Sequence, residues 1–101
     1  MNEAVVIRYA THAGAAAENQ RLVEQVFREL AGSSPPGLRY ATLRLADGVN
    51  FVHLVLDQGR DDPLTRSAAF ADFRRGLDER LAGGIVRTEA TLIGSYRLFT
   101  Q

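Results

Sequence analysis

The sequence predicts an α+β protein in which two helices cover one face of a four-stranded, antiparallel-rich sheet. Three observations carry this prediction: four segments rich in β-forming residues, two segments whose apolar residues recur at helical spacing, and an Asp-Gly pair between the two middle strands. The 101 residues suffice for one domain with one core, and 46% hydrophobic and 24% charged residues are typical of a globular chain. We therefore expect residues 1–101 to form a single domain.

The first strand and the first helix have clear sequence signals. Residues 4–10 are short, rich in β-branched residues and followed by a Thr-His-Ala-Gly loop. Residues 15–31 predict an amphipathic helix, because apolar residues recur at helical spacing while charged residues lie elsewhere on the cylinder. Its apolar stripe consists of Leu22, Val23, Val26, Phe27 and Leu30. Gly32 and the Ser-Ser-Pro-Pro-Gly stretch that follows end this helix.

The strongest local signal is a β-hairpin formed by residues 38–46 and 49–56. The pair between them, Asp47 and Gly48, tolerates the positive φ angles of a two-residue turn. Such a turn fixes which residues lie opposite one another. The expected partners are Ala46 with Val49, Leu45 with Asn50, Arg44 with Phe51, Leu43 with Val52, Thr42 with His53, and Tyr40 with Val55.

A second helix and a last strand complete the predicted fold. Phe70, Phe73, Leu77 and Leu81 form the apolar stripe of the helix, which Asp62 or Ser67 caps and a Gly-Gly pair ends. Residues 85–99 predict the strand, with a bend where Gly-Ser interrupts it. The order is β-α-β-β-α-β, and right-handed crossovers that join parallel neighbours give the ferredoxin-like sandwich.

The two faces of the hairpin differ in composition. One face is nearly all aliphatic and suits packing beneath the helices: Ala41, Leu43, Leu45, Val52, Leu54 and Leu56. The other face is mixed: Tyr40, Thr42, Arg44, Phe51, His53 and Val55. With both helices on the aliphatic face, nothing in the chain covers the mixed face. Because monomers rarely expose large apolar patches, we expect a homodimer that buries this face of the sheet.

Composition excludes several classes of function. Twelve acidic and twelve basic residues give no net charge, which argues against a nucleic-acid partner even though RNA-recognition domains share this topology. The chain has no cysteine, and all its basic residues are arginine, so thiolate metal sites and Schiff-base lysines are absent. No metal-binding pattern and no long apolar stretch occur. We therefore expect a cytoplasmic protein with no membrane contact, metal or cofactor.

The mixed face and the first helix carry the candidate functional residues. His53, a mid-strand imidazole, is a candidate proton acceptor, and Arg44 is a candidate anion clamp, so both are candidate catalytic residues. Tyr40, Thr42, Phe51 and Asn19 are candidate substrate-binding residues, and Tyr9 and Tyr96 are further candidates for an aromatic pocket. The alternative is structural: hydrogen-bonded packing for His53 and ion pairing across an interface for Arg44.

The element order resembles that of the dimeric α/β-barrel superfamily. Residues 64–73, with the sequence LTRSAAFADF, are similar to the second-helix segment of its antibiotic biosynthesis monooxygenase-like families. Many members carry a histidine where this chain has Leu64, and their haem-degrading relatives use a tryptophan, which this chain lacks. The resemblance implies a dimeric barrel that binds or oxidises a small, largely apolar organic molecule without a bound cofactor. The alternative from a different class is a non-catalytic dimerisation or accessory module.

Overall fold

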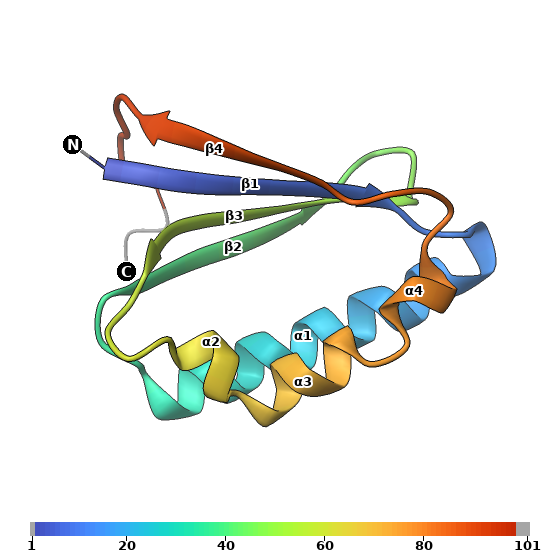
Figure 1. Cartoon of the computed structure of the whole chain (residues 1–101), viewed down its shortest axis with the longest axis horizontal. Coiled ribbons are helices and arrows are strands. Elements are labelled where there is room, and N and C mark those ends of the chain that lie inside the picture. The colour runs from blue at the N-terminus through green and yellow to red at the C-terminus, as the bar shows by residue number, and fades with distance from the viewer. Residues whose placement is uncertain (1, 99–101) are drawn as a thin grey trace.

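The computed structural model describes residues 2–98, and its elements follow the predicted order, with the second helix divided into three (Figure 1). The strands are β1 (Asn2–Ala10), β2 (Leu38–Arg44), β3 (Asn50–Gln58) and β4 (Val86–Leu92). The helices are a short 3-10 turn, η1 (Ala13–Ala15), then α1 (Ala16–Ser33), α2 (Pro63–Arg66), α3 (Ala68–Arg74) and α4 (Leu77–Arg80). The last strand therefore ends well before residue 99, its predicted limit, which lies outside the described residues.

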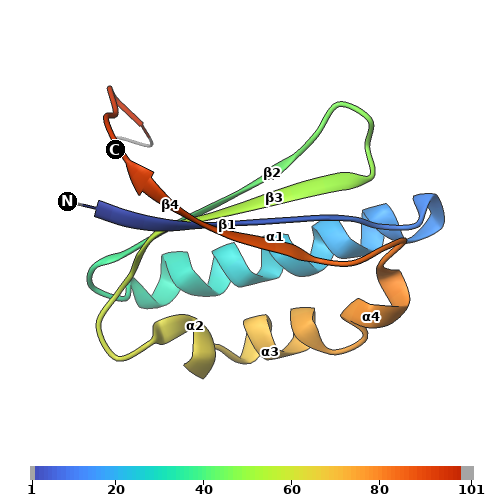
Figure 2. The same cartoon turned by 45° about the horizontal axis from the view of Figure 1, so that its top comes forward.

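The four strands form one sheet in the order β2-β3-β1-β4, which is the predicted ferredoxin-like arrangement. All three neighbouring pairs are antiparallel. Each helical crossover therefore passes over an intervening strand and does not join parallel neighbours, which corrects one part of the prediction. All the helices lie on the same side of the sheet (Figures 1 and 2). None of the helices within residues 2–98 has the length and apolarity that a membrane span requires.

The predicted hairpin register is confirmed from Tyr40–Val55 to Arg44–Phe51. The turn itself differs from the two-residue prediction. Gly48 has a φ of +82°, whereas Asp47 does not have a positive φ. The Asp47 carboxylate instead accepts hydrogen bonds of 3.0 Å from the backbone N–H groups of Val49 and Asn50. A four-residue loop thus produces the same pairing as the expected two-residue turn.

The predicted second helix is interrupted at Ser67 and Gly76. Ser67 is extended, and its Oγ accepts a 2.9 Å hydrogen bond from the backbone N–H of Phe70, so it caps α3 as predicted. Asp62 precedes α2 but makes no side-chain cap. Gly76 has a φ of +78°, a left-handed conformation that separates α3 from α4. The apolar positions of the expected stripe nevertheless still pack toward the sheet.

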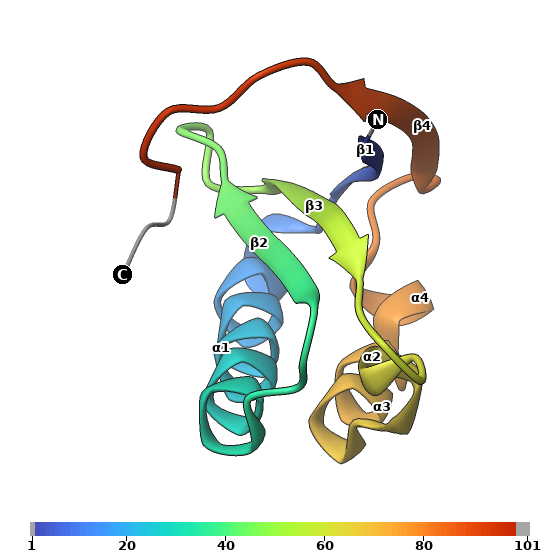
Figure 3. The ribbon, with the colours of Figure 1, turned by 90° about the vertical axis from the view of Figure 1, so that its left-hand side faces the viewer.

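The helices cover the mixed face of the hairpin, so the predicted assignment of the two faces is wrong. Phe51 and His53 are only 2% and 4% exposed, whereas Leu43 and Leu45, expected beneath the helices, are 46% and 41% exposed. The large aromatic side chains of this face bury more apolar area than aliphatic ones and reach across to the helices. Figure 3, along the strands, shows both helical segments on one side of the sheet.

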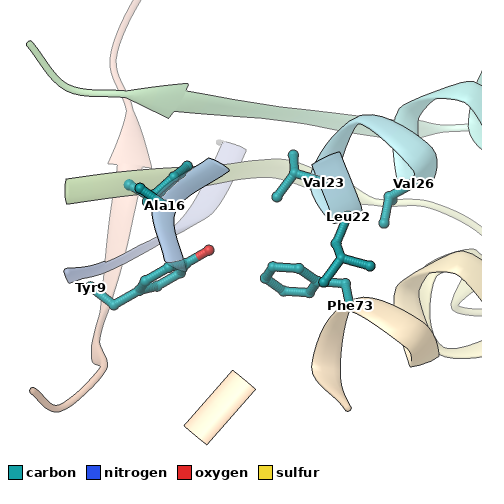
Figure 4. Packing of buried hydrophobic residues seen from close by; sticks show 7 residues of the cluster. Tyr9, Ala16, Leu22, Val23, Val26 and Phe73 are labelled. Atoms are coloured by element: carbon teal, nitrogen blue, oxygen red, sulfur yellow. The ribbon is translucent and has the colours of Figure 1, made fainter. Parts of the chain in front are cut away.

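The core lies between the covered face of the sheet and the single layer of helices (Figure 4). Tyr9 and Phe51 come from the sheet and Phe73 comes from α3. The α1 helix contributes its predicted stripe, with Leu22, Val23 and Val26 all buried. Aromatic rings therefore fill the space between the sheet and the helices, and the Tyr9 hydroxyl lies within the core.

The opposite face of the sheet has no helix over it. Val6, Val52 and Leu54 are half-buried there, and Leu43 and Val86 are exposed. After β4 the chain crosses this side of the molecule toward β2 (Figure 3), where Leu98 lies near Leu56. A largely aliphatic surface thus remains on the side that the sequence predicted to be covered, and exposed Arg8 interrupts it between Val52 and Val86.

Candidate functional site

A cavity of about 190 Å³ lies between the sheet and the α2–α4 segment. Its polar lining includes His53 of β3, Tyr9 of β1 and Tyr40 of β2. Most of the other lining side chains are apolar: Ile7, Val55, Leu64, Phe70, Phe73, Leu77 and Ile85. Arg74 and Arg87 also line it. The cavity is therefore suited to a small, largely apolar molecule that needs a few polar contacts on the sheet side.

His53 lies at the centre of a buried polar cluster, and both of its ring nitrogens have partners. Nε2 lies 2.7 Å from the Tyr9 hydroxyl, while Nδ1 lies 2.6 Å from the Tyr40 hydroxyl and 3.1 Å from Thr42 Oγ1. Burial lowers the pKa of His53 from its usual 6.5 to about 4. The imidazole is therefore neutral at neutral pH, with one nitrogen carrying a hydrogen and the other free to accept one.

The two tyrosines of the cluster are neutral as well. Burial raises the pKa of Tyr9 and that of Tyr40 to about 12 each. Hydrogen bonds from Asn19 to Tyr9 and from Thr42 to Tyr40 oppose the increase but do not cancel it. Each hydroxyl can therefore both accept and donate a hydrogen bond, which is what a proton relay requires.

The cluster extends from Tyr9 through α1 to α4. Asn19, which is 0% exposed, donates from Nδ2 to the Tyr9 hydroxyl at 3.0 Å. Arg80 donates from Nε to Asn19 Oδ1 at 3.0 Å and from Nη2 to the backbone carbonyl of Phe73 at 2.6 Å. Arg80 is only 8% exposed and forms no ion pair with a carboxylate of residues 2–98. The result is one hydrogen-bonded chain from a buried cation to the imidazole.

Five of the six predicted site residues belong to this cluster or border it. His53, Tyr40, Thr42 and Asn19 are joined by the hydrogen bonds above, and Phe51 stacks on Tyr9. The grouping of these side chains follows from the strand register and from the position of Asn19 on the α1 stripe. Their roles in binding and catalysis stay predictions.

Arg44 lies apart from His53, at the hairpin end of the covered face. Its guanidinium donates to Gln20 Oε1 at 2.7 Å and to the Gly48 carbonyl at 2.8 Å, and it sits 5.8 Å from the centroid of the Phe51 ring. It does not line the cavity. Arg44 therefore does not lie close enough to the cavity to form one anion site with His53. The cations that line the cavity are Arg74 and Arg87.

Sequence reasoning missed Arg80 entirely. Arg80 lies seven residues after Phe73 and three after Leu77, a spacing that places it on the apolar stripe of a continuous helix. A charged residue at such a position is a signal for a buried polar partner, because arginine is rarely buried without one. Tyr96, in contrast, is 82% exposed and takes no part in the cavity, unlike Tyr9.

Two other features of the described residues bear on where a site can lie. A larger hollow of about 640 Å³ adjoins this cavity, with which it shares Val55 and Arg87, and Glu3, Asp57 and Glu89 line its open polar surface. No histidine or tyrosine lines it, so it lacks the proton-transfer groups of the polar cluster. Within residues 2–98, no three His, Cys, Asp or Glu side chains are grouped closely enough to hold a metal ion.

The fold is that of the antibiotic biosynthesis monooxygenase-like proteins, whose protomer is ferredoxin-like. A candidate antibiotic biosynthesis monooxygenase from Nitrosomonas europaea is similar over 91% of this chain and 90% of its own, with a TM-score of 0.73 and 14% identity. Rv0793 from Mycobacterium tuberculosis is similar over 94% and 98%, with a TM-score of 0.71 and 18% identity.

A third similar structure is SnoaB, a cofactor-independent oxygenase from Streptomyces nogalater. It is similar over 93% of this chain and 95% of its own, with a TM-score of 0.64 and 18% identity. No family model matches the sequence, and no curated protein matches it significantly. At these levels of identity the comparisons establish a shared fold, which confirms the resemblance expected from the element order.

Proposed function

We propose that this protein binds a small, largely apolar aromatic molecule in the cavity beside His53 and oxidises it with dioxygen, without a bound cofactor. One observation carries the proposal: a neutral, buried imidazole has a tyrosine hydroxyl on each ring nitrogen, and all three residues line a cavity whose other lining is apolar except for Arg74 and Arg87. The similarity in fold to a cofactor-independent oxygenase supports it. The general base is His53, and Tyr9 and Tyr40 are the hydroxyls that contact the substrate oxygen.

The reaction that suits this site begins with removal of a phenolic proton. The resulting anion has carbanion character at a ring carbon, and it transfers an electron to dioxygen before the two radicals form a carbon–oxygen bond. The peroxide takes up a proton and then loses water, as its O–O bond and the adjacent C–H bond break. One substrate and one dioxygen thus give one carbonyl product and one water, with dioxygen as the oxidant.

Protonation of His53 is favoured only when an anion forms beside it in the cavity. Because burial lowers the pKa of His53 to about 4, its imidazolium form is stable only beside an anion. The substrate anion is such a partner when it forms next to the cluster. Arg74 and Arg87, which line the same cavity, stabilise the anion further. The predicted role of Arg44 in this step is not favoured, because its guanidinium is engaged at the hairpin.

The proposal is tested with dithranol, a phenolic anthrone, as the probe substrate. Oxygen consumption and the absorbance of the anthraquinone product are followed for the wild-type chain, for His53→Gln and for His12→Gln. His12 is the only other histidine and is exposed, so it is the matched control. We expect His53→Gln to lower turnover by about 100-fold or more, the usual contribution of a general base, and His12→Gln to leave turnover unchanged.

The rival proposal is a non-catalytic module in which the polar cluster is only a hydrogen-bonded part of the core. It is consistent with the fact that no buried side-chain nitrogen or oxygen among the described residues lacks a partner. It predicts that a panel of anthrones and naphthols neither binds nor is oxidised faster than in buffer. Such a result with folded wild-type protein would contradict the enzymatic proposal.

We also propose that the helix-free face of the sheet pairs with a second copy of the chain. Exposed Leu43, Leu45 and Val86 lie on or beside this face, together with half-buried Val52 and Leu54. Pairing two such faces removes these aliphatic side chains from water on both copies at once. The predicted homodimer through the sheet is thereby retained, but through the face opposite to the one that the sequence indicated.

A further inference from the structure

The hydrogen bonds from Arg80 to Tyr9 have a direction that chemistry fixes. An arginine guanidinium has donors and no acceptor, so the atom of Asn19 that faces Arg80 Nε is the carbonyl oxygen, at 3.0 Å. The amide nitrogen of Asn19 then faces the Tyr9 hydroxyl, also at 3.0 Å, and donates to it. The orientation of the Asn19 amide is therefore set by the buried cation behind it.

The orientation of the Asn19 amide also sets the direction of the hydrogen bond between Tyr9 and the imidazole. The Tyr9 hydroxyl has one hydrogen, and its two side-chain partners in the described chain are Asn19 and His53. Because the Asn19 amide is a donor, the hydroxyl hydrogen has only His53 Nε2, 2.7 Å away, as an acceptor. Nε2 is thus the bare nitrogen of the neutral ring, and the ring hydrogen is on Nδ1, facing Tyr40 at 2.6 Å.

We propose that Arg80 and Asn19 are positioning residues that hold neutral His53 with its hydrogen on Nδ1, so that Nε2 is the proton acceptor and is reached from the cavity through Tyr9. Neither residue contacts the cavity, since neither Asn19 nor Arg80 lines it. Both act through the Tyr9 hydroxyl. The tautomer is a property of the resting protein, and only its use in catalysis rests on the proposed function.

The relay that follows is balanced in protons. The substrate hydroxyl gives its proton to the Tyr9 oxygen as Tyr9 gives its own hydrogen to His53 Nε2, so Tyr9 is neutral before and after. The imidazole becomes the cation and the substrate becomes the anion. A transfer through a neutral tyrosine avoids a buried phenolate, which the pKa of Tyr9, about 12, disfavours. Tyr9 lines the cavity, as the relay requires.

The tautomer is measured directly by long-range proton–nitrogen correlation NMR on the 15N-labelled chain at pH 8, where protonated and bare ring nitrogens have well-separated shifts. His12→Gln assigns the His53 signals. In the wild-type protein we expect Nδ1 to be protonated and Nε2 to be bare. The opposite assignment overturns the proposal, whatever the outcome of the dithranol assay.

The role of the two positioning residues is tested by Asn19→Asp. A carboxylate has no hydrogen to donate, so the Tyr9 hydroxyl turns to donate to it, and His53 Nε2 must then donate to Tyr9. We expect the tautomer of His53 to be reversed in this variant, with the hydrogen on Nε2 and Nδ1 bare. An Nε2 that stays bare in the folded variant contradicts the assignment of Asn19.

Two further variants keep the proposal open to refutation if Asn19→Asp fails to fold. Arg80→Gln removes the fixed donor behind Asn19, because a glutamine amide can turn either way, and we expect the His53 signals to shift toward a mixture of tautomers. Tyr40→Phe is the matched control on the other ring nitrogen. It leaves Thr42 to accept from Nδ1, 3.1 Å away, so the tautomer is expected to remain that of the wild type.

Discussion

The ring of Phe51 stacks on the ring of Tyr9, with centroids 5.7 Å apart and an angle of 17° between the planes. This contact lies in the core beneath the helices, and Phe51 is 2% exposed. Truncation by Phe51→Ala therefore leaves a cavity, and we expect the free energy of unfolding in urea to fall by about 3 to 5 kcal/mol. Leu43 lies on the helix-free face, so for Leu43→Ala we expect the free energy of unfolding to fall by less than about 1 kcal/mol when the protein is dilute enough to be a monomer. Equal losses would contradict the assignment of the two faces.

Stability is expected to depend on pH through His53. Burial lowers the pKa of His53 to about 4 from 6.5, so the unfolded chain takes up a proton between these values that the folded chain does not. The neutral His53 ring makes its full contribution to the free energy of unfolding above pH 6.5. As the pH falls toward 4, this contribution is lost, and the free energy of unfolding decreases by up to about 3 kcal/mol.

The measurement compares urea unfolding of the wild type and of His53→Gln at about pH 7.5 and about pH 4.5. The carboxylates titrate equally in both proteins, so the difference between the two isolates the histidine. We expect the wild type to lose more stability than the variant on acidification. Parallel curves would show that His53 is not buried as a neutral ring.

Pairing through the helix-free face predicts that a charge there separates the copies. Leu54→Arg adds a second cation to the face that already carries Arg8, and a second sheet would have to bury it among aliphatic side chains without a partner. We expect sedimentation to show a dimer for the wild type at micromolar concentration and a monomer for this variant. Ala17→Arg, on the exposed side of α1, is the control and should sediment as the wild type does.

The start of α3 depends on the Ser67 hydroxyl. Ser67→Ala leaves the backbone N–H of Phe70 without its 2.9 Å acceptor, so we expect a loss of about 1 kcal/mol in the free energy of unfolding. Glu29, whose carboxylate accepts from the backbone N–H of Ala69 at 3.0 Å, holds the same turn from α1. The loss should be absent in Ser95→Ala, which removes an exposed hydroxyl. No difference between the two variants would rule out a stabilising cap.

The sequence predicted the order of the elements and the hairpin register because both depend on local signals. Periodicity separates strands from helices, and an even loop length between Leu45 and Asn50 fixes the pairing whichever turn closes it. The faces could not be assigned in this way. Alternation divides a strand into two sides, but both sides of this hairpin are apolar enough to be buried, and the choice depends on contacts with β1 and α1 that are distant in sequence.

The candidate site was predictable to a similar extent. His53 and Asn19 stand out as polar residues among apolar neighbours, and the register brings Tyr40 and Thr42 beside the imidazole. The part played by Arg80 was not predictable, because it depends on how α4 docks after the break at Gly76. Arg44 shares a face with His53 but lies toward the end of the strand, and a shared face does not guarantee a shared cavity.

The chain of hydrogen bonds from Arg80 to His53 joins residues contributed by β1, α1, β3 and α4. No stretch of sequence much shorter than the whole domain therefore contains the parts that give the imidazole its surroundings. The ring signals of His53 accordingly report whether the final short helix has docked, even though that helix lies far from it along the polypeptide. Substitutions that loosen this helix will change the chemistry of a residue that they never touch.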